Sequence, residues 1–385
     1  MAEFLGERTV SPFYKEIRYK GKLLLEEPLP PQNALTDKAF VIADFPDYLE
    51  AKKPDVKGIT LKKIQLYKGF LIDFSHYISL EGYLKNHFGK SSRSKLRRYL
   101  RRLDYCLEPR YKMYYGHIDK EEYDFLFAEF KSMLNRRFAQ KKERNYELQY
   151  WEEFEELTYP LIMNKKASLF VIYIGKKPIN ICMNMVYDKI LFSNVSCYDI
   201  DYSAFNLGTI DMFKHIEWCF ENKIEAMDVL KGYYYYKKRW INTIYNYEYH
   251  FVYDSKKVLN RFRVLQKSYR KSFYFKTLEK LKKIKLDVVY RKIKTLVYLS
   301  SHKNKNNTIS FTVEELTKEE WSNFGKLPKV DPSEYQINNL LKPINDFLYT
   351  KHERFKEIQV FKDDKKPNTY LVSGKSHFLK IQFQP

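Results

Sequence analysis

The sequence predicts an α/β (α+β) protein in which a mixed β-sheet is flanked by helices. A basic helical extension and a small C-terminal α+β unit are expected to follow it. Three observations support this prediction. Strand-like apolar runs alternate with amphipathic helical segments up to about residue 255. Residues 256–307 change to a strongly basic helical pattern, and residues 308–385 return to short strands around a helical middle.

Composition excludes several classes of protein. With 385 residues, of which 44% are hydrophobic, the chain has room for two or three domains with real cores. The four cysteines form no C-x-x-C pair, so we expect no disulfide framework and no metal site. The charged N-terminus predicts no signal peptide, and no apolar run approaches the roughly 20 residues of a membrane span. A reducing cytoplasm is the expected compartment.

The elements before residue 160 follow from turn residues and apolar spacing. Prolines divide residues 1–60 into short strand-like pieces. Leu80, Leu84 and Phe88 recur at helical spacing, and the pattern continues into a helix that is rich in arginine and lysine. The other predicted elements are strands at 64–75 and 111–118 and helices at 121–141 and 150–166, the last disturbed by Pro160.

Residues 167–230 carry the order strand, strand, strand, helix, strand. Gly175 and Pro178 mark the turn of a hairpin. A third strand covers residues 189–199, and the helix at 209–223 is amphipathic. The last strand ends at residues 228–230.

The turn Asn206-Leu207-Gly208-Thr209 is the first candidate site. It connects a strand directly to a helix, so main-chain N–H groups and the positive helix end would face an anion such as pyrophosphate. Gly208 would allow the anion to approach closely. The alternative is an ordinary strand-to-helix turn with an Asn or Thr cap.

The segment DVLKGYYYYKKRW, residues 228–240, is the second candidate site. It brings a carboxylate, phenols, ammonium groups and an indole to the end of a strand, where open α/β sheets bind ligands. The alternative is that Asp228 caps a turn while the tyrosines pack on the surface.

These motifs resemble the CelD/cellulose-biosynthesis group of GNAT-type acyltransferases, which is related to the Fem-type aminoacyltransferases. The resemblance runs from about Ser91 to Tyr253. Its pattern D-x-x-x-G-x-x-x-Y-K-x-x-W is matched by Asp228, Gly232, Tyr236, Lys237 and Trp240. The resemblance then implies a degenerate GNAT-like half with the basic helix at 1–160 and an acyl-CoA-binding GNAT-like core at 161–255. Tandem GNAT-like halves are therefore one option. The basic helical extension and linker at 256–307 and the small α+β unit at 308–385 would follow.

The resemblance implies an N-acyltransferase that moves an acyl group from acyl-CoA, such as acetyl-CoA, to an amino group. The acceptor would be an amino sugar or another envelope or polysaccharide precursor. Asp228 would orient or deprotonate the amine, Tyr236 would protonate the leaving sulfur, and Lys237 would bind a charged substrate group. A main-chain N–H near Val195 to Tyr198 would stabilise the oxyanion. The donor-binding residues implied are Val195, Ser196, Tyr198, Asn206, Leu207, Gly208 and Thr209.

The net charge of +21 is concentrated in two segments. Residues 90–112 hold nine Lys and Arg against two acids, and residues 256–307 hold seventeen against two. Both could bind an anionic membrane surface at the inner face of the membrane or an acyl carrier protein, and nucleic acid is the less favoured partner. The alternative is solvated helix faces with apolar undersides. A Fem-type transferase that uses aminoacyl-tRNA and a non-catalytic polyanion-binding protein also stay open.

Overall fold

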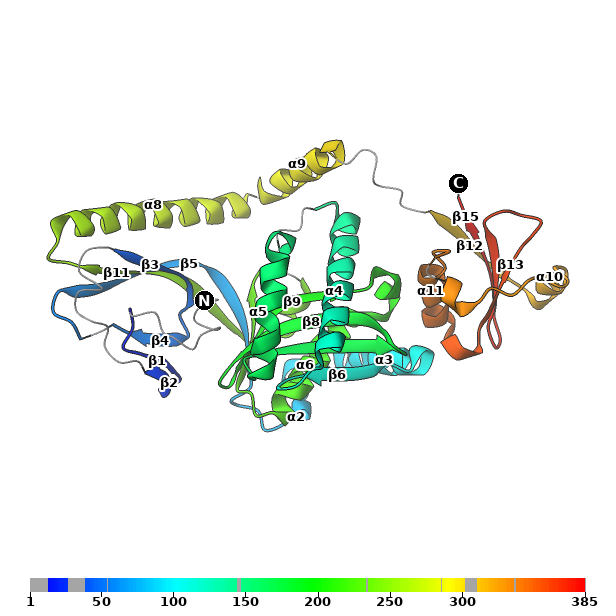
Figure 1. Ribbon diagram of the computed structural model, residues 1–385, viewed down its shortest axis with the longest axis horizontal. Helices are drawn as coiled ribbons and strands as arrows, with labels where there is room; N and C mark the ends of the chain where they lie inside the picture. Colours follow the sequence, from blue (N-terminus) through cyan, green and yellow to red (C-terminus); the bar gives the residue numbers. More distant parts are fainter. Residues whose placement is uncertain are drawn as a thin grey trace.

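The central sheet has eight strands. The computed structural model describes residues 13–26, 39–53, 55–143, 147–232, 235–284, 286–301, 310–335 and 337–384. The strands of this sheet are β3 (Phe40–Pro46), β5 (Ile59–Asp73), β6 (Arg110–Tyr114), β7 (Ala167–Ile174), β8 (Lys177–Tyr187), β9 (Ile190–Tyr198), β10 (Ala226–Lys231) and β11 (Thr243–Asp254). Their order is β3-β11-β5-β10-β9-β8-β7-β6, and only β9 and β10 pair in parallel. Helices flank this mixed sheet (Figure 1), which confirms the predicted fold class.

Two helical layers cover the middle of the sheet. On one face lie α4 (Lys120–Lys141) and α5 (Trp151–Met163), whose Phe127, Phe130 and Ile162 are fully buried against β7 to β9. The other face carries α2 (Leu80–His87), α3 (Lys90–Leu107) and α6 (Leu207–Glu221). The apolar positions of these helices recur every three or four residues, so each presents one side to the sheet.

The N-terminal end of the sheet is covered differently. A three-stranded sheet of β1 (Glu16–Tyr19), β2 (Lys22–Glu26) and β4 (Leu49–Lys52), in the order β2-β1-β4, packs below β3, β5 and β11 (Figure 1). The long helix α8 (Val258–Lys283) lies above the same strands, and α9 (Leu286–Ser301) continues from it. No helix in the described part of the chain has the length and apolar composition needed to cross a bilayer.

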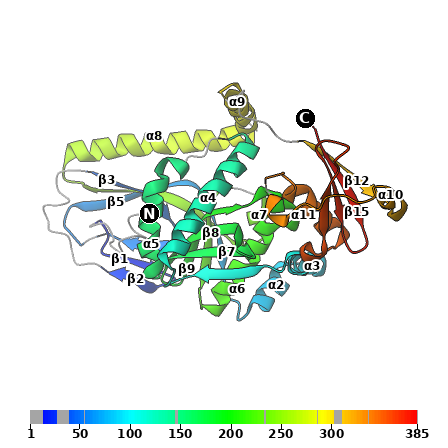
Figure 2. The same ribbon diagram turned by 45° about the vertical axis from the view of Figure 1, so that its right-hand side comes forward.

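The C-terminal unit is a four-stranded antiparallel sheet with two helices at the opposite end of the molecule from α8 (Figures 1 and 2). It consists of β12 (Phe311–Leu316), α10 (Lys318–Ser322), α11 (Leu341–Lys351), β13 (Gln359–Lys362), β14 (Thr369–Ser373) and β15 (Phe378–Phe383). β14 and β15 form a hairpin, in which the amide of Gly374 donates to the carbonyl of His377 at 2.9 Å.

Several elements differ from the prediction. The helical pattern at 80–103, which left one helix or two open, corresponds to two helices, because the chain becomes extended at Phe88 and Gly89 caps α3. A short 3-10 helix, η3 (Ile200–Phe205), separates β9 from α6, which were expected to join directly. β11 was not predicted, although it pairs with β5 along most of its length. The expected boundary at 160/161 falls within one sheet, to which both sides contribute strands.

Candidate functional site

The parallel strands β9 and β10 separate partway along their length. They pair at three positions, the last of which joins Phe192 to Asp228. Beyond it, β9 continues to Tyr198 and β10 to Lys231 without pairing with each other. Asn194 is an extra residue in β9 relative to β8, and such a bulge increases the local twist of a strand. We call residues 193–198 of β9 and 229–231 of β10 the strand fork.

The N-terminus of α6 lies just after the fork in the chain. The amides of Thr209 and Ile210 donate to the carbonyl of Asn206 at 2.8 and 3.3 Å. For the amides of Leu207 and Gly208, the described residues provide no acceptor. A Cβ placed on Gly208 would meet nothing within 4 Å, so the space beside it is open. Two unpaired donors at the positive end of a helix form a favourable environment for an anion.

Ionic contacts fix the segment between β9 and α6. The guanidinium of Arg136, on α4, bonds Asp199 at 2.8 Å and Asp201 at 2.7 Å. Lys177 bonds the second carboxylate oxygen of Asp199 at 2.9 Å, and Asp199 is only 2% exposed. From the C-terminal unit, the amide of Asn345 donates to the main-chain carbonyl of Asp201 at 3.0 Å. These contacts determine where the first turn of α6 begins.

Asp228 sits at the vertex of the fork and is fully buried. Its carboxylate accepts hydrogen bonds from the hydroxyls of Tyr48 at 2.8 Å and Tyr245 at 2.7 Å, and from the amide of Leu230 at 2.7 Å. Burial raises the pKa of Asp228 to about 6, although these donors and the nearby Lys237 act in the opposite direction. A carboxyl group with such a pKa is suited to accepting a proton near neutral pH.

Lys237 lies close to Asp228 on the short helix α7 (Tyr235–Lys238). Its ammonium donates to the carbonyl of Val229, the first residue of β10 beyond the paired region. Burial lowers the pKa of Lys237, while Asp228 and Cys182 raise it. Lys237 is therefore close enough to both Asp228 and Cys182 to interact with them electrostatically. The side chain of Tyr236 is outside the described residues.

The predicted donor-binding residues of β9 differ in exposure. Ser196 is exposed and its hydroxyl bonds Asp211, whereas Val195 and Tyr198 are half-buried. The guanidinium of Arg137 lies 4.9 Å from the centre of the Tyr198 ring. The predicted residues of β9 lie on one arm of the strand fork, and Ser196 bonds Asp211 in the first turns of α6. Asp228 and Lys237 lie at the vertex of the fork and on its other arm. Of the turn residues, Leu207 has a buried side chain, and the main-chain amide of Asn206 donates a hydrogen bond to the carbonyl of Ser203.

A buried polar network lies between β8 and α6. The potential metal ligands Cys182, Asp211 and His215 have ligand atoms within 4.8 Å of one another. Nε2 of His215 is 3.0 Å from the amide nitrogen of Asn184, and Asn180 donates to Asp211 at 2.8 Å. Burial raises the pKa values of Cys182 and Asp211. The thiol of Cys182 donates to the side-chain oxygen of Asn184 at 3.3 Å, so the same hydrogen-bond network connects all these residues.

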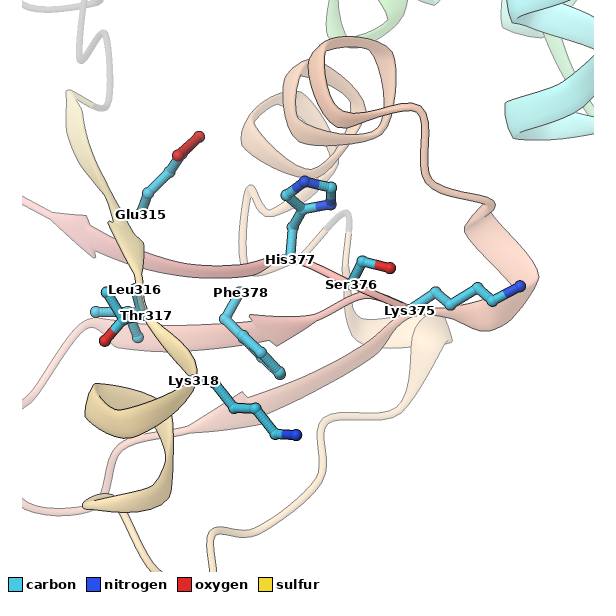
Figure 3. Close-up of a pocket in the computed structure, with 8 residues that line it drawn as sticks. All are labelled: Glu315, Leu316, Thr317, Lys318, Lys375, Ser376, His377 and Phe378. Carbon is cyan, nitrogen blue, oxygen red and sulfur yellow. The ribbon is translucent and has the colours of Figure 1, made fainter.

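A surface pocket of about 390 Å³ belongs to the C-terminal unit (Figure 3). Figure 3 shows its walls, which are formed by Glu315, Leu316, Thr317, Lys318, Lys375, Ser376, His377 and Phe378. None of these residues was predicted to be functional, and none comes from the fork or from α6.

Sequence reasoning missed the tyrosines that bond Asp228. Tyr245 belongs to a strand, β11, in which alternate residues are aromatic, so the strand could have been found from its period of two. Its contact with Asp228 depends on the pairing of β11 with β5, which is not local. Tyr48 precedes β4 and carries no comparable signal in the sequence.

Comparison with known proteins identifies the segment that contains this region. Residues 90–238 match the model of the acetyltransferase (GNAT) domain. The match begins at α3, includes the fork and the α6 N-terminus, and ends at α7. It does not distinguish the CelD/cellulose-biosynthesis group, so that narrower resemblance stays a prediction. No curated protein matches the chain.

Solved structures with a similar arrangement are distant in sequence. A conserved protein of unknown function from Bacteroides thetaiotaomicron is 11% identical, with a TM-score of 0.34 over 51% of this chain and 63% of that one. L-PGS from Bacillus licheniformis is 13% identical, with a TM-score of 0.33 over 53% and 66%. FemX is 12% identical, with a TM-score of 0.39 over 55% and 68%. The chain thus spans less than two thirds of the first two proteins.

Proposed function

We propose that this chain is an N-acyltransferase that uses an acyl-CoA as its donor. The observation that supports this most directly is the strand fork beside the open α6 N-terminus, within the segment that matches the GNAT domain. The thioester arm of the donor would extend along the unpaired edge of β9, where main-chain groups have no partner strand. Its pyrophosphate would accept hydrogen bonds from the amides of Leu207 and Gly208.

The reaction would join the amine nitrogen of the acceptor to the thioester carbonyl carbon and break the carbon–sulfur bond. The negative charge that develops on the carbonyl oxygen would be stabilised by a main-chain N–H of β9 between Val195 and Tyr198. The amine proton would pass to Asp228, which is ionised above its pKa of about 6. Because Asp228 is fully buried, the hydroxyl of Tyr48, which donates to it, would transmit this proton.

The thiolate that leaves requires a proton or a positive charge. Lys237 would supply the charge, because its ammonium lies at the fork. Tyr236, the neighbouring residue, is the proposed proton donor. The resemblance of the sequence to the CelD/cellulose-biosynthesis group supports an amino sugar or another envelope or polysaccharide precursor as acceptor.

Calorimetry with acetyl-CoA and longer acyl-CoAs tests the donor site. We expect the wild type to bind and Gly208→Glu to bind about tenfold more weakly or worse, because a carboxylate would face the pyrophosphate. The open space at Gly208 accommodates the new side chain, so the loss would not reflect unfolding.

Gly89→Glu is the matched control. Gly89 is also at a helix N-terminus, that of α3, and its Cβ would also meet nothing within 4 Å. This variant should bind acyl-CoA like the wild type. Equal binding by both variants would remove the α6 N-terminus from the donor site. A wild type that binds aminoacyl-tRNA but no acyl-CoA would assign the donor to aminoacyl-tRNA instead.

A further inference from the structure

We propose that α8 and α9, together called the arm, dock the protein on an anionic membrane surface. The arm comprises Val258–Lys283 and Leu286–Ser301 and lies along one edge of the molecule in both views (Figures 1 and 2). This inference concerns where the protein binds, and it stands whether or not the chain transfers acyl groups.

The inner side of α8 is anchored to the sheet. Asn260, Val264 and Ser268 are at most 5% exposed, and they recur every four residues. Val264 packs with Phe251 and Tyr253 of β11. Further along, the ring of Phe275 lies 5.8 Å from that of Tyr67, and Lys271 lies over the ring of Tyr249. α8 is therefore fixed in orientation, and its other side faces outward.

The outer side of α8 is apolar, which is unusual for a helix side in contact with water. Its large side chains are 46–78% exposed and lie opposite Val264 at helical spacing. They are Val258, Leu259, Phe262, Leu265, Tyr269 and Phe273. A contiguous row of this kind on a soluble protein marks a surface that binds something apolar.

α9 repeats the pattern. Leu286, Tyr290 and Ile293 follow one another at spacings of four and three residues, so they share one side of the helix. They are 44–60% exposed, and the nearby Leu296 is 65% exposed. Each helix of the arm thus carries its own row of exposed apolar side chains.

Basic residues accompany the apolar row. Between residues 258 and 301 there are thirteen Lys and Arg against two acids. By helical spacing, Arg263 and Arg270 flank the row of α8 on one side and Arg261 on the other. Long basic side chains can reach lipid phosphates while their stems cover apolar surface. An apolar row flanked by cations fits a helix that lies in the plane of an anionic bilayer.

Other occupants fit these observations less well. Nucleic acids are bound mainly through phosphate contacts and base stacking, in which exposed Val, Leu and Ile side chains have little part. A second copy would bring two strongly positive arms together, and their repulsion would oppose the contact. The anionic membrane surface complements both the charge and the apolar row.

Vesicle sedimentation with the full chain tests the proposal. We expect the wild type to sediment with vesicles of phosphatidylcholine and phosphatidylglycerol in equal parts and to remain in solution with phosphatidylcholine alone. The triple variant Phe262→Ser, Tyr269→Ser, Phe273→Ser should reduce the partition coefficient on the order of tenfold or more, because three exposed apolar groups no longer insert. Arg270→Glu with Lys280→Glu should weaken binding to the anionic vesicles in a salt-dependent way.

A matched control replaces three exposed apolar residues outside the arm. Ile78→Ser, Leu157→Ser, Val313→Ser should bind vesicles like the wild type, since these side chains are 54–103% exposed elsewhere. Circular dichroism checks that all variants stay folded. The proposal is overturned if the wild type shows no preference for anionic vesicles, or if the arm variant binds like the control. Binding of tRNA or dimerisation in place of vesicle binding would also overturn it.

Discussion

The carboxyl group of Asp228 illustrates how burial and hydrogen bonding set the chemistry of a single residue. Burial alone would keep the group protonated, but three donors surround it and hold its pKa to about 6. The hydroxyls of Tyr48 and Tyr245 both donate hydrogen bonds to this carboxylate. The site therefore contains a carboxylate that is mostly ionised at pH 7 although it is fully buried.

This environment predicts how stability depends on pH. The folded-state pKa of Asp228 is raised from 3.8 to about 6, so its favourable contribution is fully present below pH 3.8 and is lost as pH rises through 6. Asp228→Asn has no such ionisation. Between about pH 4 and pH 7, the free energy of unfolding of the wild type should fall relative to the variant by up to about 3 kcal/mol. Urea unfolding of both proteins across this range measures it, and a constant difference would contradict the pKa.

The partners of Asp228 show why the sequence predicted only half of this site. Asp228 was found because it ends a strand before an unusual run of tyrosines. Tyr245 reaches it only because the residue opposite on β5 is Gly69, where a Cβ would lie 2.1 Å from the Tyr245 ring. That close approach depends on the register between β5 and β11, which are far apart in the chain. Local patterns carry no information about such a register.

At the scale of elements, the helix that presents Gly208 is positioned by the segment before it. The sequence predicted α6 and its amphipathic side well, because its apolar spacing is regular. It did not predict η3, because a short 3-10 helix has too few residues to show a period. What holds η3 is Arg136 on α4, distant in sequence from both aspartates it bonds.

Removing this contact should loosen the start of α6. Arg136→Gln leaves the buried Asp199 with Lys177 as its cationic partner, so we expect a loss of about 1–3 kcal/mol in the free energy of unfolding. Acyl-CoA binding should weaken as well, because the amides of Leu207 and Gly208 would lose their fixed position. Lys131→Gln, an exposed change on the same helix, is the control and should alter neither quantity. Unchanged stability in Arg136→Gln would show that η3 does not depend on this contact.

At the scale of the whole molecule, the arm and the candidate site are connected through one residue. Phe275 of α8 packs on Tyr67, whose hydroxyl bonds Asp44 and lies 3.4 Å from the ammonium of Lys231 at the end of the fork. An arm docked on a membrane by its outer side would thus hold this end of the fork beneath α8, on the side of the helix away from the lipid. The sequence indicated the basic arm but not its contact with the sheet, which depends on packing between distant segments.

The C-terminal unit is joined to the rest of the molecule by a shared core, although the sequence suggested a separate unit. Fully buried Leu348 on α11 belongs to the same cluster as Leu103 and Phe205, and its carbonyl accepts from the thiol of Cys106 at 3.4 Å. Leu348→Ala should therefore lower the free energy of unfolding of the whole chain by about 2–5 kcal/mol. It should also speed the reaction of Cys106, which is 2% exposed, with a thiol reagent.

The control is Cys219, which is on the buried side of α6 and should stay protected in both proteins. Mass spectrometry of the labelled peptides would distinguish it from Cys106. Equal labelling rates for Cys106 in the variant and the wild type would mean that the C-terminal unit does not protect α3.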